Sequence, residues 1–245
     1  MDFYQQSLKI KREIGDVGGE SASLNNLGNA YNSLGQYQTA IDFYQQSLKI
    51  TREIGDVRGE SASLNNLGAA YDSLGQYQTA IDFYQQSLKI KREIGDVGGE
   101  SASLIGLGNA YNSLGQYQTA IDFYQQSLKI KREIGDVGGE SYSLGNLGNA
   151  YNSLGQYQTA IDFHQQSLKI TREIGDVGGE SNSLGNLGNV YYSLGQYQTA
   201  IDFYQQSLKI TREIGDVGGE SNSLNGLGNV YYSLGQYQTA IDFHQ

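Results

Sequence analysis

The sequence has no cysteine, and only two of its 245 residues are histidines. The absence of cysteine excludes disulfide bonds, thiolate metal ligands and cysteine nucleophiles together. A reducing compartment permits such a composition, and we therefore expect a cytoplasmic protein.

Long apolar runs and concentrated positive charge are also missing. The chain has no run of about eighteen apolar residues, the length that a membrane-spanning helix needs. Its formal net charge is -10, and Lys49 and Arg52 are accompanied by Glu53, Asp56 and Glu60. Because phosphate groups and anionic lipids are repelled by such a surface, we expect neither nucleic acid nor a membrane as a partner.

The sequence is instead a series of repeats. The segment 23–50, SLNNLGNAYNSLGQYQTAIDFYQQSLKI, returns every forty residues with few changes, which predicts stacked units. We divide the chain into a partial helix B at 1–15, repeats 1 to 5 at 16–55, 56–95, 96–135, 136–175 and 176–215, and a truncated repeat 6 at 216–245. Because both ends fall inside a helix B, we expect the chain to be a piece of a longer array.

Each repeat contains two stretches with helical periodicity. Helix A, at about 16–34, is predicted by an apolar stripe with spacings of three, four and three: Leu24, Leu27, Tyr31 and Leu34. Helix B, at about 36–54, is predicted by a broader stripe, which comprises Tyr37, Ala40, Ile41, Phe43, Tyr44, Leu48, Ile50 and Ile54. Each repeat is therefore expected to be an antiparallel helical hairpin.

Glycines mark the helix ends and one close contact. Gly35 and Gly55 follow the apolar stripes and can take the left-handed conformation that closes a helix, and Asp56 can cap the next helix. Gly28 lies inside helix A, where glycine costs about 1 kcal/mol relative to alanine. We expect another helix to approach too closely there for a side chain, so that hairpins stack into a continuous core; a merely tolerated glycine is the alternative.

These residues resemble the tetratricopeptide repeat signature, through Leu24-x-x-Leu27-Gly28-x-x-Tyr31 followed by Ala40-x-x-x-Tyr44. The usual closing proline is replaced by Arg52 and the period is forty, which is similar to the long repeats of kinesin light chains and Leu-Gly-Asn proteins. The resemblance implies an all-α fold, an α-solenoid in which stacked helix A/helix B hairpins form a right-handed superhelix with helix A on the concave side. It also implies that the protein holds a protein or peptide partner.

The six repeats differ from one another mainly on one face of helix A. Nine of forty columns vary, and five of these, at 22, 25, 26, 29 and 32, lie together on the helix opposite the core stripe. Asparagine both donates and accepts hydrogen bonds, and tyrosine is favoured at interfaces, so this face predicts a groove for an extended peptide. Its candidate residues are Asn26, Asn29, Asn66, Asn109, Tyr142, Asn146, Asn149, Asn186, Asn189, Tyr192, Asn229 and Tyr232. Neutral drift on an exposed face is the alternative.

The sequence indicates neither a cationic site for a carboxylate nor a catalytic site. Some tetratricopeptide domains grip a terminal carboxylate with lysine and arginine on helix A, but the five columns hold no cation, and we do not expect that mode. His164 and His244 replace Tyr44 in a core column and lack metal-ligand spacing, so we expect packed histidines. No serine has a nearby histidine base. We therefore expect no enzyme, no metal and no cofactor.

A second hypothesis is a structural array that associates end to end. Tyr237, Ile241 and Phe243 lie on the last helix B, where no further hairpin follows in the sequence. Burial of one large apolar side chain contributes roughly 1.5 to 3 kcal/mol, so several together predict weak homo-oligomers through open solenoid ends.

Overall fold

The computed structural model describes residues 2–244, and all of its regular elements are α-helices. The thirteen helices of this region are α1 (Asp2–Glu13), α2 (Val17–Ser33), α3 (Tyr37–Ile54), α4 (Val57–Ser73), α5 (Tyr77–Glu93), α6 (Val97–Ser113), α7 (Tyr117–Glu133), α8 (Val137–Ser153), α9 (Tyr157–Ile174), α10 (Val177–Ser193), α11 (Tyr197–Ile214), α12 (Val217–Ser233) and α13 (Tyr237–His244). Within residues 2–244, none is both long and apolar enough to cross a bilayer.

The helices begin and end as the sequence predicts. The Asp56 carboxylate accepts a hydrogen bond of 2.9 Å from the backbone N–H of Gly59, which caps the start of α4. Gly35 and Gly55 have φ angles of 72° and 69°, in the left-handed region that a residue with a Cβ adopts at a cost. The even-numbered helices α2 to α12 correspond to helix A, and the odd-numbered helices to helix B.

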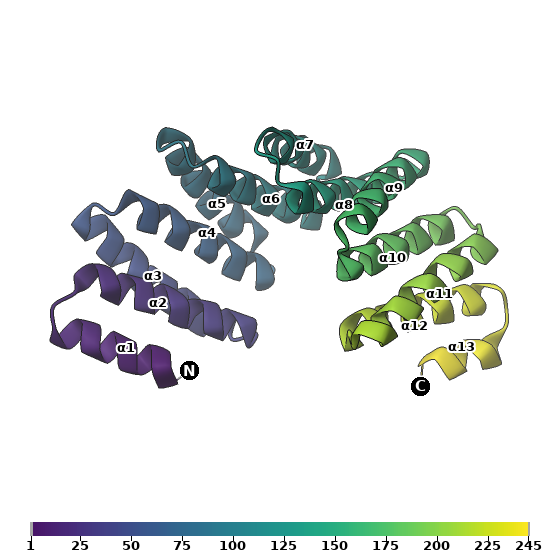
Figure 1. Ribbon diagram of the computed structural model, residues 1–245, viewed down its shortest axis with the longest axis horizontal. Coiled ribbons are helices and arrows are strands. Elements are labelled where there is room, and N and C mark those ends of the chain that lie inside the picture. Colours follow the sequence, from purple (N-terminus) through teal and green to yellow (C-terminus); the bar gives the residue numbers. More distant parts are fainter. Residues whose placement is uncertain (1, 245) are drawn as a thin grey trace. The chain divides into compact units, whose positions relative to one another are not determined.

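The chain consists of two compact units, residues 1–130 and 131–245. Within each unit, helices that follow one another in the sequence pack side by side, as Figure 1 shows for α2, α3 and α4 in the first unit. In the first unit α3 and α5, and in the second unit α9 and α11, each pack against the helix A before and the helix A after, which is the arrangement of an α-solenoid.

The core lies between successive hairpins. Ile41 and Tyr44 of α3 form one buried cluster with Leu64 and Leu67 of α4, from the following repeat. A Cβ placed on Gly28 would lie 2.6 Å from Cδ1 of Tyr44, so the prediction of a close helix contact at Gly28 is confirmed.

Two residues assigned to the apolar stripes are not in the core. Leu34 is 59% exposed and Ile54 is 45% exposed. Both lie at the end of a helix, beside the glycines that close it, and the chain turns there before a neighbouring helix can cover them. The prediction that Leu34 and Ile54 belong to the core stripes is therefore wrong.

Buried serines join consecutive helices, a feature that the apolar pattern does not reveal. Oγ of Ser47 donates to the backbone carbonyl of Ser21 at 2.9 Å and lies 3.1 Å from Oγ of Ser63. Ser207 makes the equivalent contacts in the second unit. Each of these serines thus satisfies its hydroxyl group while bridging helix B to the helices A on both sides.

The arginine in the place of the usual proline pairs with the next repeat. Nε of Arg52 lies 2.7 Å from Oε1 of Glu60, which links the end of α3 to the first turn of α4. The same pair recurs as Arg12–Glu20, Arg92–Glu100, Arg132–Glu140, Arg172–Glu180 and Arg212–Glu220. Because the arginines are about half exposed, each pair contributes little stability, of the order of 1 kcal/mol or less.

Candidate functional site

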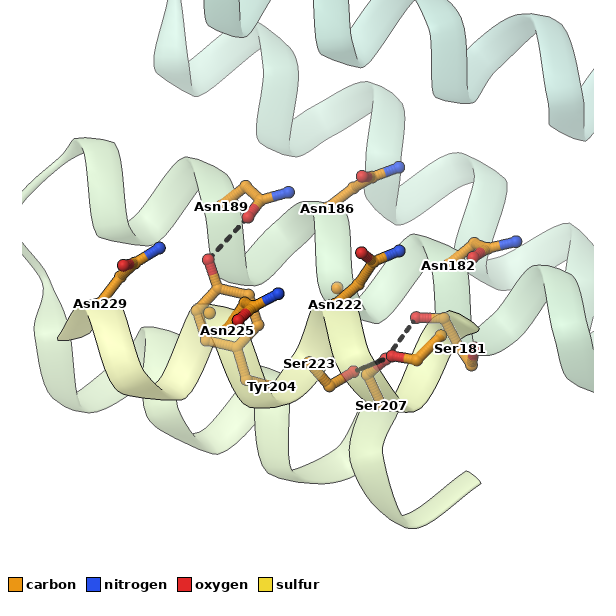
Figure 2. Close-up of a pocket in the computed structure, with 13 residues that line it drawn as sticks. Ser181, Asn182, Asn186, Asn189, Tyr204, Ser207, Asn222, Ser223, Asn225 and Asn229 are labelled. Atoms are coloured by element: carbon orange, nitrogen blue, oxygen red, sulfur yellow. Dashed lines mark hydrogen bonds between the residues drawn. The ribbon is translucent and has the colours of Figure 1, made fainter. Parts of the chain in front are cut away.

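In the second unit, the varying faces of two successive helices A form a polar pocket of about 280 Å³. Two rows of three asparagines line it, as Figure 2 shows, with their amide nitrogens on one side of the helices. The rows are Asn182, Asn186 and Asn189 on α10 and Asn222, Asn225 and Asn229 on α12. None of the pocket's lining residues carries a charge. The site therefore offers neutral hydrogen-bonding groups, which suit a peptide backbone.

A buried tyrosine orients one of these asparagines. The hydroxyl of Tyr204 donates a hydrogen bond of 2.7 Å to Oδ1 of Asn189 (Figure 2). Burial raises the pKa of Tyr204 to about 12, so the hydroxyl stays protonated at neutral pH. With its oxygen engaged, the Asn189 side chain presents its NH₂ group to the groove as a donor for carbonyl oxygens.

Glycine makes room for this tyrosine on both sides. A Cβ on Gly188 would lie 2.7 Å from the Tyr204 ring, and one on Gly226 would lie 2.6 Å from it. The Tyr204 ring on α11 is thus held between α10 and α12, and its hydroxyl is directed at the groove.

In the first unit, the same tyrosine-asparagine pair occurs twice. Tyr44 bonds to Asn29 and Tyr124 to Asn109, both at 2.7 Å. Burial raises the pKa of Tyr44 to about 12. Repeat 2 lacks the pair because Ala69 occupies the asparagine column.

The other candidates of the first unit are less uniform. Asn26 is exposed on α2. Nδ2 of Asn66 lies 3.5 Å from Oδ1 of Asn25 and 3.4 Å from Oδ1 of Asn29, so part of its hydrogen-bonding capacity is used between α2 and α4.

A second pocket of the second unit, of about 190 Å³, brings Tyr142 together with Asn146, Asn149 and Asn186. The Tyr142 side chain is 55% exposed and borders this pocket. Nδ2 of Asn146 is buried and has no hydrogen-bond partner within the described residues.

His164 is buried in the tyrosine column, as predicted. Neither ring nitrogen has a hydrogen-bond partner in the described part of the chain, and burial lowers the pKa of His164 to about 4. The imidazole packs on Gly148 of α8, so it fills the tyrosine's place but supplies no hydroxyl for Asn149. The side chain of His244 lies outside the described residues.

Tyr192 and Tyr232 lie apart from the asparagine pockets. The ring of Tyr192 lies 5.8 Å from that of Tyr197, and its hydroxyl is 3.1 Å from Oγ of Ser233. Tyr232 contacts Tyr237 edge to face at 5.4 Å. Neither Tyr192 nor Tyr232 lines the two pockets described above, and each instead pairs with the tyrosine five residues later.

The residues proposed for end-to-end contact differ in exposure. Tyr237 and Ile241 are exposed. The ring of Phe243, in contrast, stacks on that of Tyr231 at 5.4 Å, so Phe243 already has an aromatic partner within its own hairpin.

Asn182, Asn222 and Asn225 were not predicted from the sequence as site residues, yet these three line the larger pocket. All three stand in varying columns of helix A. The column of Ala22 changes from alanine in repeats 1 to 3 to asparagine at Asn182 and Asn222, and this change could have indicated a polar site in the last repeats. Across residues 2–244, no group of three or more His, Cys, Asp or Glu side chains could hold a metal ion.

Comparisons with known proteins agree with this architecture. A family model described as Tetratricopeptide repeat matches residues 2–53, 19–93, 60–133, 99–173, 139–213 and 179–245. No curated protein matches the sequence.

Three solved structures illustrate the likeness. BtubC (BKLC) from P. vanneervenii has a TM-score of 0.76 and 21% identity over 87% of this chain and 90% of that chain. A putative kinesin light chain from Podosopora anserina, with nearly identical TPR-like repeats, has a TM-score of 0.66 and 25% identity over 79% of this chain and 95% of that chain. A Rap protein complexed with competence and sporulation factor has a TM-score of 0.72 and 15% identity over 92% of this chain and 73% of that chain.

Proposed function

Because the chain belongs to the tetratricopeptide repeat family, we propose that it is a non-catalytic scaffold module that binds an extended peptide along the asparagine rows of its helices A. The observation that carries this proposal is the uncharged pocket lined by six asparagines, one of which is oriented by Tyr204. Amide groups that point to one side can pair with the N–H and C=O groups of a peptide backbone.

The strength of such binding is limited. A net hydrogen bond contributes about 0.5 to 1.5 kcal/mol, and ordering an extended peptide offsets part of the sum. We therefore expect dissociation constants near micromolar, about -8 kcal/mol. Apolar side chains of the peptide would add affinity where they contact Tyr142, which borders the smaller pocket.

The comparisons support a binding role only in general terms. A protein of the same fold, the Rap protein, was solved with competence and sporulation factor bound. The residues that would bind a peptide in the present chain are proposed from its own geometry. The lack of cysteine is compatible with a cytoplasmic location.

A selection of short peptides tests the proposal. A random library of short peptides with amidated C-termini is screened on the immobilised chain, and the best binders are measured by calorimetry. Changing Asn186, Asn189 and Asn229 to alanine should weaken binding at least about tenfold while circular dichroism stays unchanged. Lys49→Ala is the control, because Lys49 lies exposed on α3 and its Nζ pairs with the Glu53 carboxylate at 3.9 Å.

Two outcomes would argue against this function. If no peptide is selected, the chain is not a peptide-binding module of the kind proposed. If a selected peptide keeps its affinity after the asparagine changes but loses it after changes on helix B, the site lies on the other face.

A structural array that self-associates is the second candidate. Phe3 is 83% exposed on α1, and Ile241 is 47% exposed on α13. Burying both against further copies would favour weak association. Sedimentation at rising protein concentration should then show oligomers that disappear in Phe3→Glu and Ile241→Glu variants. A strict monomer at all concentrations would leave the peptide groove as the better candidate.

A further inference from the structure

The varying face of the helices A carries one charged side chain, Asp72 of α4. In the five varying columns, every other residue of the six repeats is uncharged. The column of Asp72 otherwise holds asparagine or tyrosine, at Asn32, Asn112, Asn152, Tyr192 and Tyr232. A single carboxylate among neutral groups selects the charge of whatever binds beside it.

Asp72 reverses the hydrogen-bonding character of its column. At Asn32, Asn112 and Asn152, Oδ1 is buried and has no hydrogen-bond partner within residues 2–244, so the amide nitrogen is the outer atom of the side chain. Oδ1 of Asp72 is buried in the same way, and here the outer atom is a carboxylate oxygen. The asparagines therefore present donors at this place, whereas Asp72 presents only an acceptor.

The Asp72 carboxylate has no compensating charge. Among the described residues no ion pair involves Asp72, whereas acidic residues such as Glu60 and Glu100 are paired with arginines. Burial raises the pKa of Asp72, because the charged form loses part of its hydration. A cation placed beside Asp72 would offset this loss.

The neighbouring side chain suits a cation as well. A side chain in this column lies beside the tyrosine five residues later: the rings of Tyr192 and Tyr197 are 5.8 Å apart in repeat 5, and repeat 6 has the same pairing. In repeat 2 this tyrosine is Tyr77, which is partly exposed. A carboxylate next to an aromatic face is a favourable environment for an ammonium or guanidinium group.

Repeat 2 also lacks the asparagine that would contact the peptide backbone. Ala69 stands in that column between Asn29 and Asn109, and it is partly buried. It precedes Asp72 by three residues, so the two positions share a face of α4 and lie about one helical turn, roughly 5.4 Å, apart. A peptide held by Asn29 and Asn109 therefore has room at Ala69 for a long side chain that reaches Asp72.

We propose that Asp72 binds a lysine or arginine side chain of the peptide, with the cation between the Asp72 carboxylate and the Tyr77 ring, and that this contact sets the register of the peptide on the first unit. The inference rests on the proposed function of the asparagine rows. It adds a preference for a basic residue at one position. The net charge of -10 gives, in contrast, only a general attraction for basic peptides that does not depend on position.

The repeats themselves supply the variants. Asp72→Asn introduces the residue that repeats 1, 3 and 4 carry in the same column. Asp82→Asn is the matched control, since it removes the same charge from an exposed position on α5, a helix B. A moved-site variant, Asp72→Asn/Asn109→Ala/Asn112→Asp, transfers both features of repeat 2 to repeat 3. Circular dichroism should be unchanged in all three.

The experiment begins with selection on the immobilised wild-type chain from a random library of short peptides. Their N-termini are acetylated and their C-termini amidated, so that side chains carry the only charges. In the best binder the basic residue is replaced by norleucine, and lysine is then reintroduced at each position in turn. The wild type should bind best with lysine at the original position, about tenfold more tightly than it binds the norleucine peptide.

The variants locate the cation on the chain. Asp72→Asn should abolish this affinity peak, and Asp82→Asn should keep it. In the moved-site variant the peak should return at a displaced position. Packed helices lie about 10 Å apart and an extended chain advances about 3.3 Å per residue, so the displacement should be about three residues. A merely structural role of Asp72 would not move the peak.

The outcomes separate this proposal from the one it rests on. Peptides without a basic residue at a fixed position, a peak that survives Asp72→Asn, or a moved-site variant without a displaced peak would overturn the cation site and leave the asparagine groove standing. A position-independent preference for basic residues that remains in Asp72→Asn reports only the net charge and also counts against the site. Failure to select any peptide would overturn the proposed function and the cation site with it.

Discussion

The hydroxyl of Tyr204 on α11 donates a 2.7 Å hydrogen bond to the side-chain oxygen of Asn189 on α10. One partner is buried in the core and the other is exposed in the groove. The packing of helix B against helix A thus decides which way an exposed amide points. The pair recurs at Tyr44–Asn29 and Tyr124–Asn109, so repeats 1, 3 and 5 each contain an oriented donor.

Tyr204→Phe should weaken peptide binding by about three- to tenfold, which corresponds to the net free energy of one hydrogen bond. The free energy of unfolding should change little. The phenyl ring retains the packing against Gly188 and Gly226, while Asn189 loses the group that holds its oxygen. Calorimetry with a selected peptide measures the change.

A double-mutant cycle supplies the control for Tyr204→Phe. In an Asn189→Ala background, the tyrosine change should have no further effect on affinity. An equal loss in both backgrounds would show that Tyr204 acts on the peptide without Asn189.

Gly148→Ala should destabilise the chain by about 1 to 3 kcal/mol, because the new methyl group would lie 2.6 Å from Nε2 of His164. Gly145→Ala, three residues earlier in α8, is the matched control, since nothing but Oγ of Ser167 comes as near as 4.0 Å. The control should be neutral or stabilise by up to about 1 kcal/mol, as alanine is the better helix former. Urea unfolding of both variants measures the difference, and equal effects would contradict the close contact.

The fold could be predicted because its determinants repeat with the helical period. Leu24 and Leu27, the Asp56 cap and the glycine turns all recur in register, and the structure confirms their roles. Leu34 and Ile54 fit the period equally well but lie exposed at helix ends. The helical period gives the face on which a residue lies, but it does not say whether a neighbouring helix extends far enough to cover that residue. Buried serines such as Ser47 were missed for the opposite reason, because a hydroxyl group adds nothing to an apolar stripe.

The site could be predicted only in outline. Comparing the repeats located the varying face of helix A, which depends on spacing along a single helix. The orientation of Asn189 depends on a residue fifteen positions later, and Nζ of Lys91 contacts Asn65 on the preceding helix, twenty-six positions earlier. Such contacts between helices require the packed structure, since no local pattern encodes them.

The stability of the chain should fall as the pH decreases below about 6.5, in part because of His164. Burial lowers the pKa of His164 to about 4 in the folded chain, from 6.5 in the unfolded chain. Above pH 6.5 the imidazole is neutral in both states, so its contribution to stability is complete. Between pH 6.5 and 4 the unfolded chain takes up the proton first, and by about pH 4.5 the loss should reach about 2 kcal/mol.

His164→Tyr isolates this contribution, because tyrosine does not titrate in that range and already occupies the column in other repeats. The free energy of unfolding in urea, measured near pH 7 and near pH 4.5, should drop by about 2 kcal/mol less in the variant than in the wild type. Carboxylate titrations are common to both chains and cancel in the comparison. The new hydroxyl should also bond Asn149, as Tyr204 bonds Asn189, and so raise stability near pH 7. Parallel pH dependence in the two chains would mean that His164 is charged, or partnered by water, in the folded state.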